Sequence, residues 1–225
     1  MPFNISFRWS AEPGVDLESP GLRSIRAGIE SNTVAEFLSL DYVYPGFPDP
    51  TATLESIAGY NAFREHPLTE GVGTAYLHVI PYALPHRDGR NHYFVCKDMT
   101  GTSRKVNNSY PYPDPTKYNE TQEMFQTSVP SNPLPRIPQR REDEPAMIPD
   151  MSLQVAEIPG RKPRPTSNVF AASTSLIDWM DNTRAAPDEC GAWFDSRWGG
   201  HTMPIPQRAV TEPPRVEPFF PGWAG

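Results

Sequence analysis

The sequence predicts an α+β fold in which a small, curved antiparallel sheet packs on an N-terminal helix and long Pro-rich irregular straps surround both. Three observations predict it: helical apolar spacing over residues 20–40, a β-hairpin pattern over residues 72–99, and 28 prolines among 225 residues, concentrated after residue 110. Each proline fixes φ and removes a backbone N–H, so these stretches cannot form helices or central strands. Much of the later chain is therefore expected to be extended and rich in turns.

The helix is predicted from its start signal and its apolar spacing. Ser19 suits an N-cap and Pro20 suits the first helical position. The apolar residues that follow recur at helical spacing: Leu22, Ile25, Ile29, Val34, Phe37 and Leu38. We therefore predict an amphipathic helix over residues 20–40, after an irregular lead over residues 1–18.

The hairpin is predicted from two segments that are rich in β-branched and aromatic residues, Thr74–Leu84 and Asn91–Met99. Asp88-Gly89 between them is typical of a two-residue turn. That turn would place Tyr82 opposite Val95. The residues then expected on one face, toward the core, are Leu77, Val79, Ala83, Phe94 and Cys96.

These elements divide the chain into segments. Residues 19–106 are predicted to form the α+β core, and residues 107–166 a Pro-rich strap or linker. Core-forming sequence returns over residues 167–200, where Gly191–Trp198 reads as a short aromatic strand or turn. Residues 201–225 form a Pro-rich aromatic tail.

Composition excludes several classes of partner. The net charge of −7 gives no basic stripe, so we expect no nucleic acid to bind. The chain contains no run of 18 apolar residues, so no membrane span is predicted. The first ten residues have no apolar stretch of the kind that an export signal requires.

Cys96 and Cys190 are the only cysteines. We predict that they form a disulfide that ties the late segment to the hairpin, the alternative being two separate thiols in a reducing compartment. A catalytic thiol at Cys190 is disfavoured, because the neighbouring Asp188 and Glu189 would raise its pKa.

No other motif predicts chemistry. His86 and His92 flank the hairpin turn with Asp88 nearby, but their spacing matches no zinc site. The chain has no nucleophile elbow, phosphate loop or dinucleotide fingerprint. We therefore predict no catalytic residue, no metal and no cofactor.

Aromatic residues within the Pro-rich segments are the stronger indication of function. An extended segment that carries aromatic rings packs them into grooves, either on its own domain as a strap or on another chain as a docking tail. The residues concerned are Tyr110, Tyr112, Tyr118, Phe219, Phe220 and Trp223. Our first hypothesis is a non-catalytic structural or accessory protein that docks through them on partner protein subunits or on the cell envelope.

Two alternatives remain open. The first is a small-ligand-binding, cone-shaped α+β domain with a pocket under the sheet. The residues expected to line it are Tyr76, His78, Tyr82, Tyr93 and Asp98. The second, and least favoured, is a cysteine or metal hydrolase.

Short motifs in a fixed order carry a resemblance. They are Tyr44-Pro-Gly-Phe47, Phe94-Val-Cys96, Asn168-Val-Phe170, Cys190-Gly-Ala-Trp193 and Pro221-Gly-Trp223. Their order resembles that of a group of actinobacterial proteins, many of them exported or lipid-anchored. The resemblance implies an extracytoplasmic, disulfide-bonded α+β domain and implies no activity. The missing export signal departs from that pattern, and an intracellular or virion assembly is the alternative location.

Overall fold

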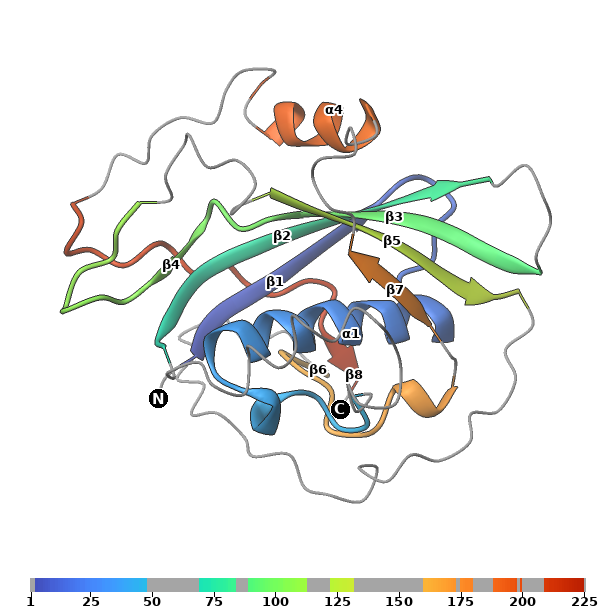
Figure 1. Cartoon of the computed structure of the whole chain (residues 1–225), viewed down its shortest axis with the longest axis horizontal. Helices are drawn as coiled ribbons and strands as arrows, with labels where there is room; N and C mark the ends of the chain where they lie inside the picture. The colour runs from blue at the N-terminus through green and yellow to red at the C-terminus, as the bar shows by residue number, and fades with distance from the viewer. Residues whose placement is uncertain are drawn as a thin grey trace.

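The computed structural model shows an open, curled sheet with helix α1 (Pro20–Phe37) on one face and helix α4 (Asp188–Arg197) on the other (Figure 1). The predicted α+β class is confirmed. The structure describes residues 3–47, 69–83, 89–112, 122–131, 160–172, 175–179, 188–197, 199 and 209–224. Within these residues, no helix has the length and apolar character needed to cross a membrane.

The sheet is mixed. Its main strands, in spatial order, are β1 (Phe3–Ala11), β2 (Gly71–Tyr82), β3 (Arg90–Asp98), β5 (Gln122–Pro130) and β7 (Leu176–Trp179). The first two are parallel, and the remaining neighbours are antiparallel. Helix α1 lies between β1 and β2 along the chain, because adjacent parallel strands need a crossover connection.

Strand β1 corrects the prediction of an irregular lead over residues 1–18. Apolar and polar residues alternate along it, and this period of two places one set of side chains in the core. The set consists of Phe3, Ile5, Phe7 and Trp9, all buried. Strand β1 is therefore an edge strand whose apolar face is buried.

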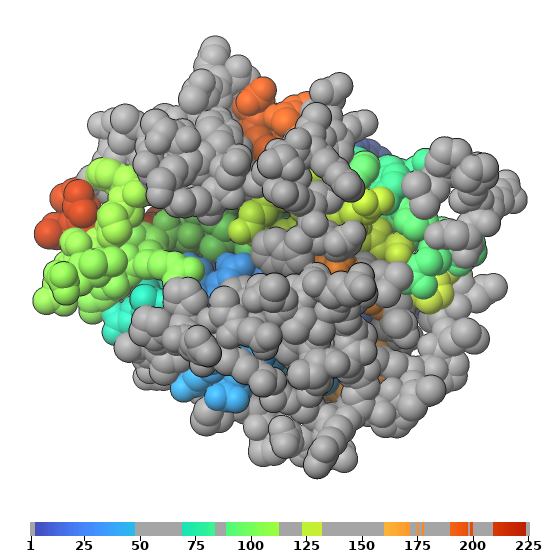
Figure 2. All heavy atoms as spheres, in the orientation of Figure 1, coloured from blue at the N-terminus to red at the C-terminus, as the bar shows by residue number. Residues whose placement is uncertain are grey.

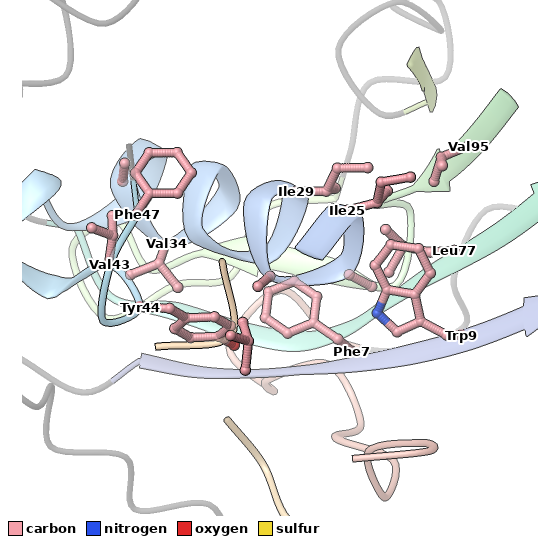
Figure 3. Close-up of a cluster of buried hydrophobic side chains, with 14 of the residues drawn as sticks. Phe7, Trp9, Ile25, Ile29, Val34, Val43, Tyr44, Phe47, Leu77 and Val95 are labelled. Carbon is pink, nitrogen blue, oxygen red and sulfur yellow. The ribbon is translucent and has the colours of Figure 1, made fainter. Parts of the chain in front are cut away.

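The main core lies between the sheet and α1 (Figure 3). Ile25 and Ile29 of the helix belong to the same buried cluster as Phe7 and Trp9 of β1. The helix predicted over residues 20–40 is confirmed from Pro20 to Phe37, and a short 3-10 turn, η1 (Leu40–Tyr42), follows it. A second such turn is η4 (Phe170–Ala172).

The predicted hairpin exists, but its predicted register is wrong. Tyr82 pairs with His92 rather than with Val95, which instead pairs with Val79. The connection is longer than two residues, and the register shifts by an odd number. An odd shift moves side chains to the opposite face. Phe94 and Cys96 consequently lie on the α4 face, not with the core residues on the α1 face.

A β-bulge follows β3. Tyr76 pairs with Asp98 and Gly73 with Thr102, so three steps along β2 match four along the opposite strand, which continues as β4 (Thr102–Arg104). Gly73 has φ +123°, and a Cβ there would lie 2.1 Å from the carbonyl oxygen of Gly101. The bulge therefore requires glycine at this position.

Two further segments differ from expectation. Strand β5 lies inside the segment 107–166 that was predicted as a Pro-rich strap. In the segment Gly191–Trp198, predicted as a strand or turn, residues 191–197 belong to α4, and Trp198 lies outside the described residues. Its Cys190 and Phe194 are buried, and Trp193 and Arg197 are half-buried. These residues lie at the spacing of one helix face.

Residues 209–224 form the C-terminal strap, which reaches the outer edge of β1 at Phe220. Phe220 accepts a hydrogen bond from the Trp9 N–H and donates one to the Phe7 carbonyl, at 2.8 and 3.0 Å. The strap ends in β8 (Trp223–Ala224), which pairs with β6 (Arg161–Lys162) in a separate two-stranded sheet. The strap thus covers an edge strand that would otherwise expose hydrogen-bonding groups.

Candidate functional site

A polar and aromatic cluster lies between the sheet and α4. Where β1 and β2 run in parallel, Arg8 pairs with Tyr76 and Ser10 pairs with His78. These residues alternate with the core residues and so point away from α1. The α4-face cluster comprises Arg8, Ser10, Glu12, Tyr76, His78, Asp98, Trp193, Arg197 and Glu217.

The disulfide between Cys96 and Cys190 fixes α4 over this face. Their Cα atoms are 5.6 Å apart, both residues are fully buried, and the predicted pairing is confirmed. Bonding of Cys190 removes the free thiol that a catalytic cysteine would need. The disulfide lies in a second apolar cluster with Ile80, Met124 and Phe194. The helix is therefore held by a covalent bond together with a small apolar contact.

A buried ion pair adds a polar connection. The Nε atom of Arg197 donates to the Oδ2 atom of Asp98 at 2.6 Å, and Asp98 is fully buried. The Asp98 Oδ1 atom accepts the Thr100 N–H at 2.9 Å. The guanidinium also lies 3.5 Å from the ring centroid of Tyr76. Burial, and the hydrogen bond to Glu217, raise the pKa of Tyr76. The buried Asp98 carboxylate thus has a partner at each of its two oxygens, as burial of a charge requires.

His78 is the centre of the other half of the cluster. Its Nδ1 atom lies 2.8 Å from the Ser10 Oγ, and its Nε2 atom lies 3.3 Å from the Glu12 Oε1. The Trp193 indole stacks on the imidazole, with ring centroids 5.4 Å apart and planes inclined by 8°. His78 is buried, whereas Ser10 and Glu12 are exposed. A nearly inaccessible imidazole thus contacts two accessible polar groups.

The residues predicted to line a pocket do not all share one face. Tyr76, His78 and Asp98 lie together against α4. Tyr82 is on the same face but stacks on Phe94, with centroids 4.1 Å apart. The fifth residue was wrongly placed: Tyr93 packs against the core on the α1 face. The odd shift of register accounts for this difference.

The residues predicted to dock partners divide into two groups. Phe219 and Trp223 are buried in their own chain, and they act as the anchors of the strap. Phe220 is 51% exposed. Tyr110 and Tyr112 are half-buried. The remaining one, Tyr118, lies outside the described residues, as do His86 and Asp88.

A buried carboxylate holds the end of the strap. Glu30 of α1 accepts hydrogen bonds from Trp9 Nε1 at 2.7 Å, Tyr44 Oη at 2.7 Å and Trp223 Nε1 at 3.1 Å. Burial raises the pKa of Glu30, because few charged groups offset the loss of water. The Arg26 guanidinium lies 4.3 Å from the Trp223 ring centroid. These contacts make Glu30 the polar connection between helix, sheet edge and strap.

A second ionic cluster lies at the C-terminal end of α1. Lys97 is fully buried, with Nζ 2.9 Å from Glu123 Oε2 and 3.7 Å from Glu36 Oε2. Burial and the neighbouring Glu123 carboxylate raise the pKa of Glu36 to about 7. Burial alone would lower the pKa of Lys97, but the two carboxylates outweigh it and raise that pKa. Two carboxylates therefore share one ammonium group.

Sequence reasoning missed Ser10, Glu12 and Arg197. The alternation of apolar residues from Phe3 to Trp9 would have predicted β1, and with it the outward direction of Ser10. The spacing of Cys190, Trp193, Phe194 and Arg197 would have predicted a helix with Arg197 on its buried face. Within the described residues, no group of three His, Cys, Asp or Glu side chains has a geometry that suits a metal ion.

Comparison with protein-family models, with curated proteins and with solved structures gives no match to this chain.

Proposed function

We propose that this protein is a structural or accessory protein that docks on partner protein subunits through its Pro-rich aromatic segments. The observation that carries the proposal is the position of its exposed large apolar side chains. Within the described residues these are Val106, Val210 and Phe220, which are 48%, 43% and 51% exposed. Val106 belongs to a turn near Tyr110, and Val210 and Phe220 belong to the C-terminal strap. All three lie outside the helices and the strands of the sheet.

Val106 and Val210 lie in segments that are joined by a main-chain hydrogen bond. The Tyr110 N–H donates to the Val210 carbonyl. Val106 begins a tight turn whose central residues, Asn107 and Asn108, both have positive φ, at 48° and 63°. Figures 1 and 2 show the start of the strap, in red, beside the green segment of residues 102–112 at one end of the molecule. An ordered turn and an ordered strap thus expose apolar groups together.

The strap itself shows how such a segment binds protein. Phe220 forms main-chain hydrogen bonds with the edge strand β1, while the side chains of Phe219 and Trp223 are buried. Extended peptides bind other proteins through the same two kinds of contact. A segment that is rich in proline loses little conformational entropy on binding, which favours this use.

The disulfide supports an extracytoplasmic location. Disulfides persist in oxidising compartments and are rare where thiol reductants are abundant. The resemblance that we proposed from the short sequence motifs would place the protein in the same kind of compartment. We therefore place the proposed partner outside the cytoplasm, at the cell envelope.

The pocket hypothesis receives less support. Tyr76, His78 and Asp98 were expected to face a ligand, but they contact Arg197 and Trp193 of α4. Their polar groups bind side chains of their own chain. We accordingly favour docking over small-ligand binding.

The proposal is tested by photo-crosslinking in the native source. A photoreactive phenylalanine analogue replaces Val106 or Val210, and a matched control replaces Ala192, which is exposed on α4. We expect one protein to be crosslinked from both positions and not from position 192. The double substitution Val106→Asp and Val210→Asp should abolish the native complex.

Two results together would refute docking at this end of the molecule. One is crosslinking from positions 106 and 210 that does not exceed crosslinking from position 192. The other is migration of the protein as a compact monomer in size-exclusion chromatography of a gentle extract.

A further inference from the structure

The contacts of His78 have the geometry of an activated nucleophile. The Ser10 Oγ lies 2.8 Å from Nδ1 of the imidazole, and the Glu12 Oε1 lies 3.3 Å from Nε2. A hydroxyl beside an imidazole that a third group orients is the arrangement used to activate serine. We call these three side chains the Ser10–His78–Glu12 row.

The carboxylate determines which nitrogen carries the proton. An ionised Glu12 can only accept hydrogen bonds, so the Nε2 atom of His78 must carry hydrogen to bind it. In the neutral imidazole the Nδ1 atom is then unprotonated and faces the Ser10 hydroxyl. The Ser10 Oγ also lies 3.2 Å from the Leu77 carbonyl oxygen, so its proton has two acceptors, of which Nδ1 at 2.8 Å is the nearer. With its proton directed to Nδ1, the neutral row is poised to transfer that proton from Ser10 to His78.

Neighbouring elements hold the imidazole in place. Trp193 stacks on one side of the ring, and the disulfide of Cys190 fixes the helix that carries Trp193. Ser10 and His78 are direct partners in the parallel ladder between β1 and β2. His78 is therefore buried, whereas Ser10 is an exposed residue.

We propose that Ser10 is a nucleophile that reacts with carboxylic esters to form an acyl-serine, with His78 as general base and Glu12 as a positioning residue. The Ser10 Oγ attacks the ester carbonyl carbon while its proton moves to His78 Nδ1. The bond between the carbonyl carbon and the alkoxy oxygen then breaks. The alcohol leaves with that proton, and the acyl group remains on Ser10. This reactivity goes beyond docking and does not depend on it.

A fluorophosphonate probe tests the proposal directly. Attack forms a bond between Ser10 Oγ and phosphorus, fluoride leaves, and the proton passes to His78. Intact mass and peptide sequencing then give the number and position of labels. We expect about one label per chain, on Ser10, and its absence from Ser10→Ala. Ser131→Ala, at an exposed serine outside the row, should react like the native protein.

Two further variants separate chemistry from structure. His78→Gln should slow labelling by roughly 100-fold, the usual contribution of a general base, with α4 still folded by circular dichroism. Glu12→Gln should slow labelling, and the conservative variant Glu12→Asp should restore it. The proposal is overturned if native protein labels no faster than protein unfolded in urea, or if Ser10→Ala labels at the native rate.

Discussion

Replacing Glu36 by glutamine should remove the pH dependence that the Glu36 carboxyl gives to the free energy of unfolding. Glu36 lies in the last turn of α1, where the helix dipole disfavours a carboxylate. It shares the buried Lys97 ammonium with Glu123, and its pKa is raised from 4.5 to about 7. The folded state therefore holds a proton that the unfolded chain releases at neutral pH.

The direction of the effect follows from the raised pKa. Below about pH 4.5 the carboxyl is protonated in both states, and its full contribution to stability is present. As the pH rises through about 7, the carboxyl ionises in the folded state too, and the contribution is lost. At about 1.4 kcal/mol per pKa unit, the free energy of unfolding falls by about 2.5 kcal/mol between roughly pH 5 and pH 8.

Thermal and urea unfolding measured at the two pH values provide the assay. The Glu36→Gln variant cannot ionise at this position, so its stability relative to the native protein should rise by about 2.5 kcal/mol from the lower to the higher pH, or about 5–10 °C in Tm. Glu212→Gln, at an exposed carboxylate, should show no such gain. Parallel pH dependence in the native protein and in Glu36→Gln would refute the assignment to this carboxyl.

Three other changes test the fold. Gly73→Ala should lower the free energy of unfolding by about 2–4 kcal/mol in urea titrations, whereas Gly160→Ala, where space is open, should cost about 1 kcal/mol; equal losses would contradict the clash at the bulge. Trp223→Phe should lower the free energy of unfolding by about 1–2 kcal/mol, because the Glu30 carboxylate loses a hydrogen-bond donor. Amide hydrogen exchange in the strap should also become faster. Unchanged exchange in the strap would argue against Trp223 as its anchor. Joint replacement of Cys96 and Cys190 by alanine should lower the free energy of unfolding by about 2–5 kcal/mol. Amide hydrogen exchange should then increase in α4 before it increases in α1. The reverse order would contradict the conclusion that α4 is the more weakly held helix.

Local signals predicted what depends on local chemistry. The start of α1 at Pro20 follows from the Ser19-Pro20 pair, and the apolar spacing that continues from Leu22 predicts the helix. The two segments of the hairpin follow from their β-branched and aromatic residues. In each case the residues that determine the local structure lie close to one another in the sequence.

Register was not predictable from the same signals. The Asp88-Gly89 pair favoured a two-residue turn, but the ladder ends at Tyr82 and His92. Backbone pairing in a strand depends on which face is buried, and that depends on contacts far along the chain. Cys96 illustrates this dependence. It lies on the α4 face, where it forms a disulfide with Cys190, 94 residues later in the chain.

The candidate site escaped prediction for a related reason. Ser10, His78 and Arg197 come from three distant segments, and nothing in their local sequence marks them as neighbours. Only the parallel pairing of β1 with β2, and the disulfide that positions α4, bring them together. Sequence periodicity can place each residue on a face, but it cannot show which faces meet.

Helices α1 and α4 are held to the sheet by different kinds of contact. The stability of the fold and the geometry of the candidate site therefore depend on different residues. Helix α1 buries nearly every side and anchors the main core, so its loss is equivalent to unfolding. Helix α4 depends on one disulfide, a small apolar cluster, the stacked Trp193 ring and the Arg197–Asp98 pair. An isolated helix of this length is unstable in water, so these few contacts must order it. The α4-face cluster is therefore the part of the structure whose geometry can change while the fold persists, and the covalent bond to Cys96 is what limits that change.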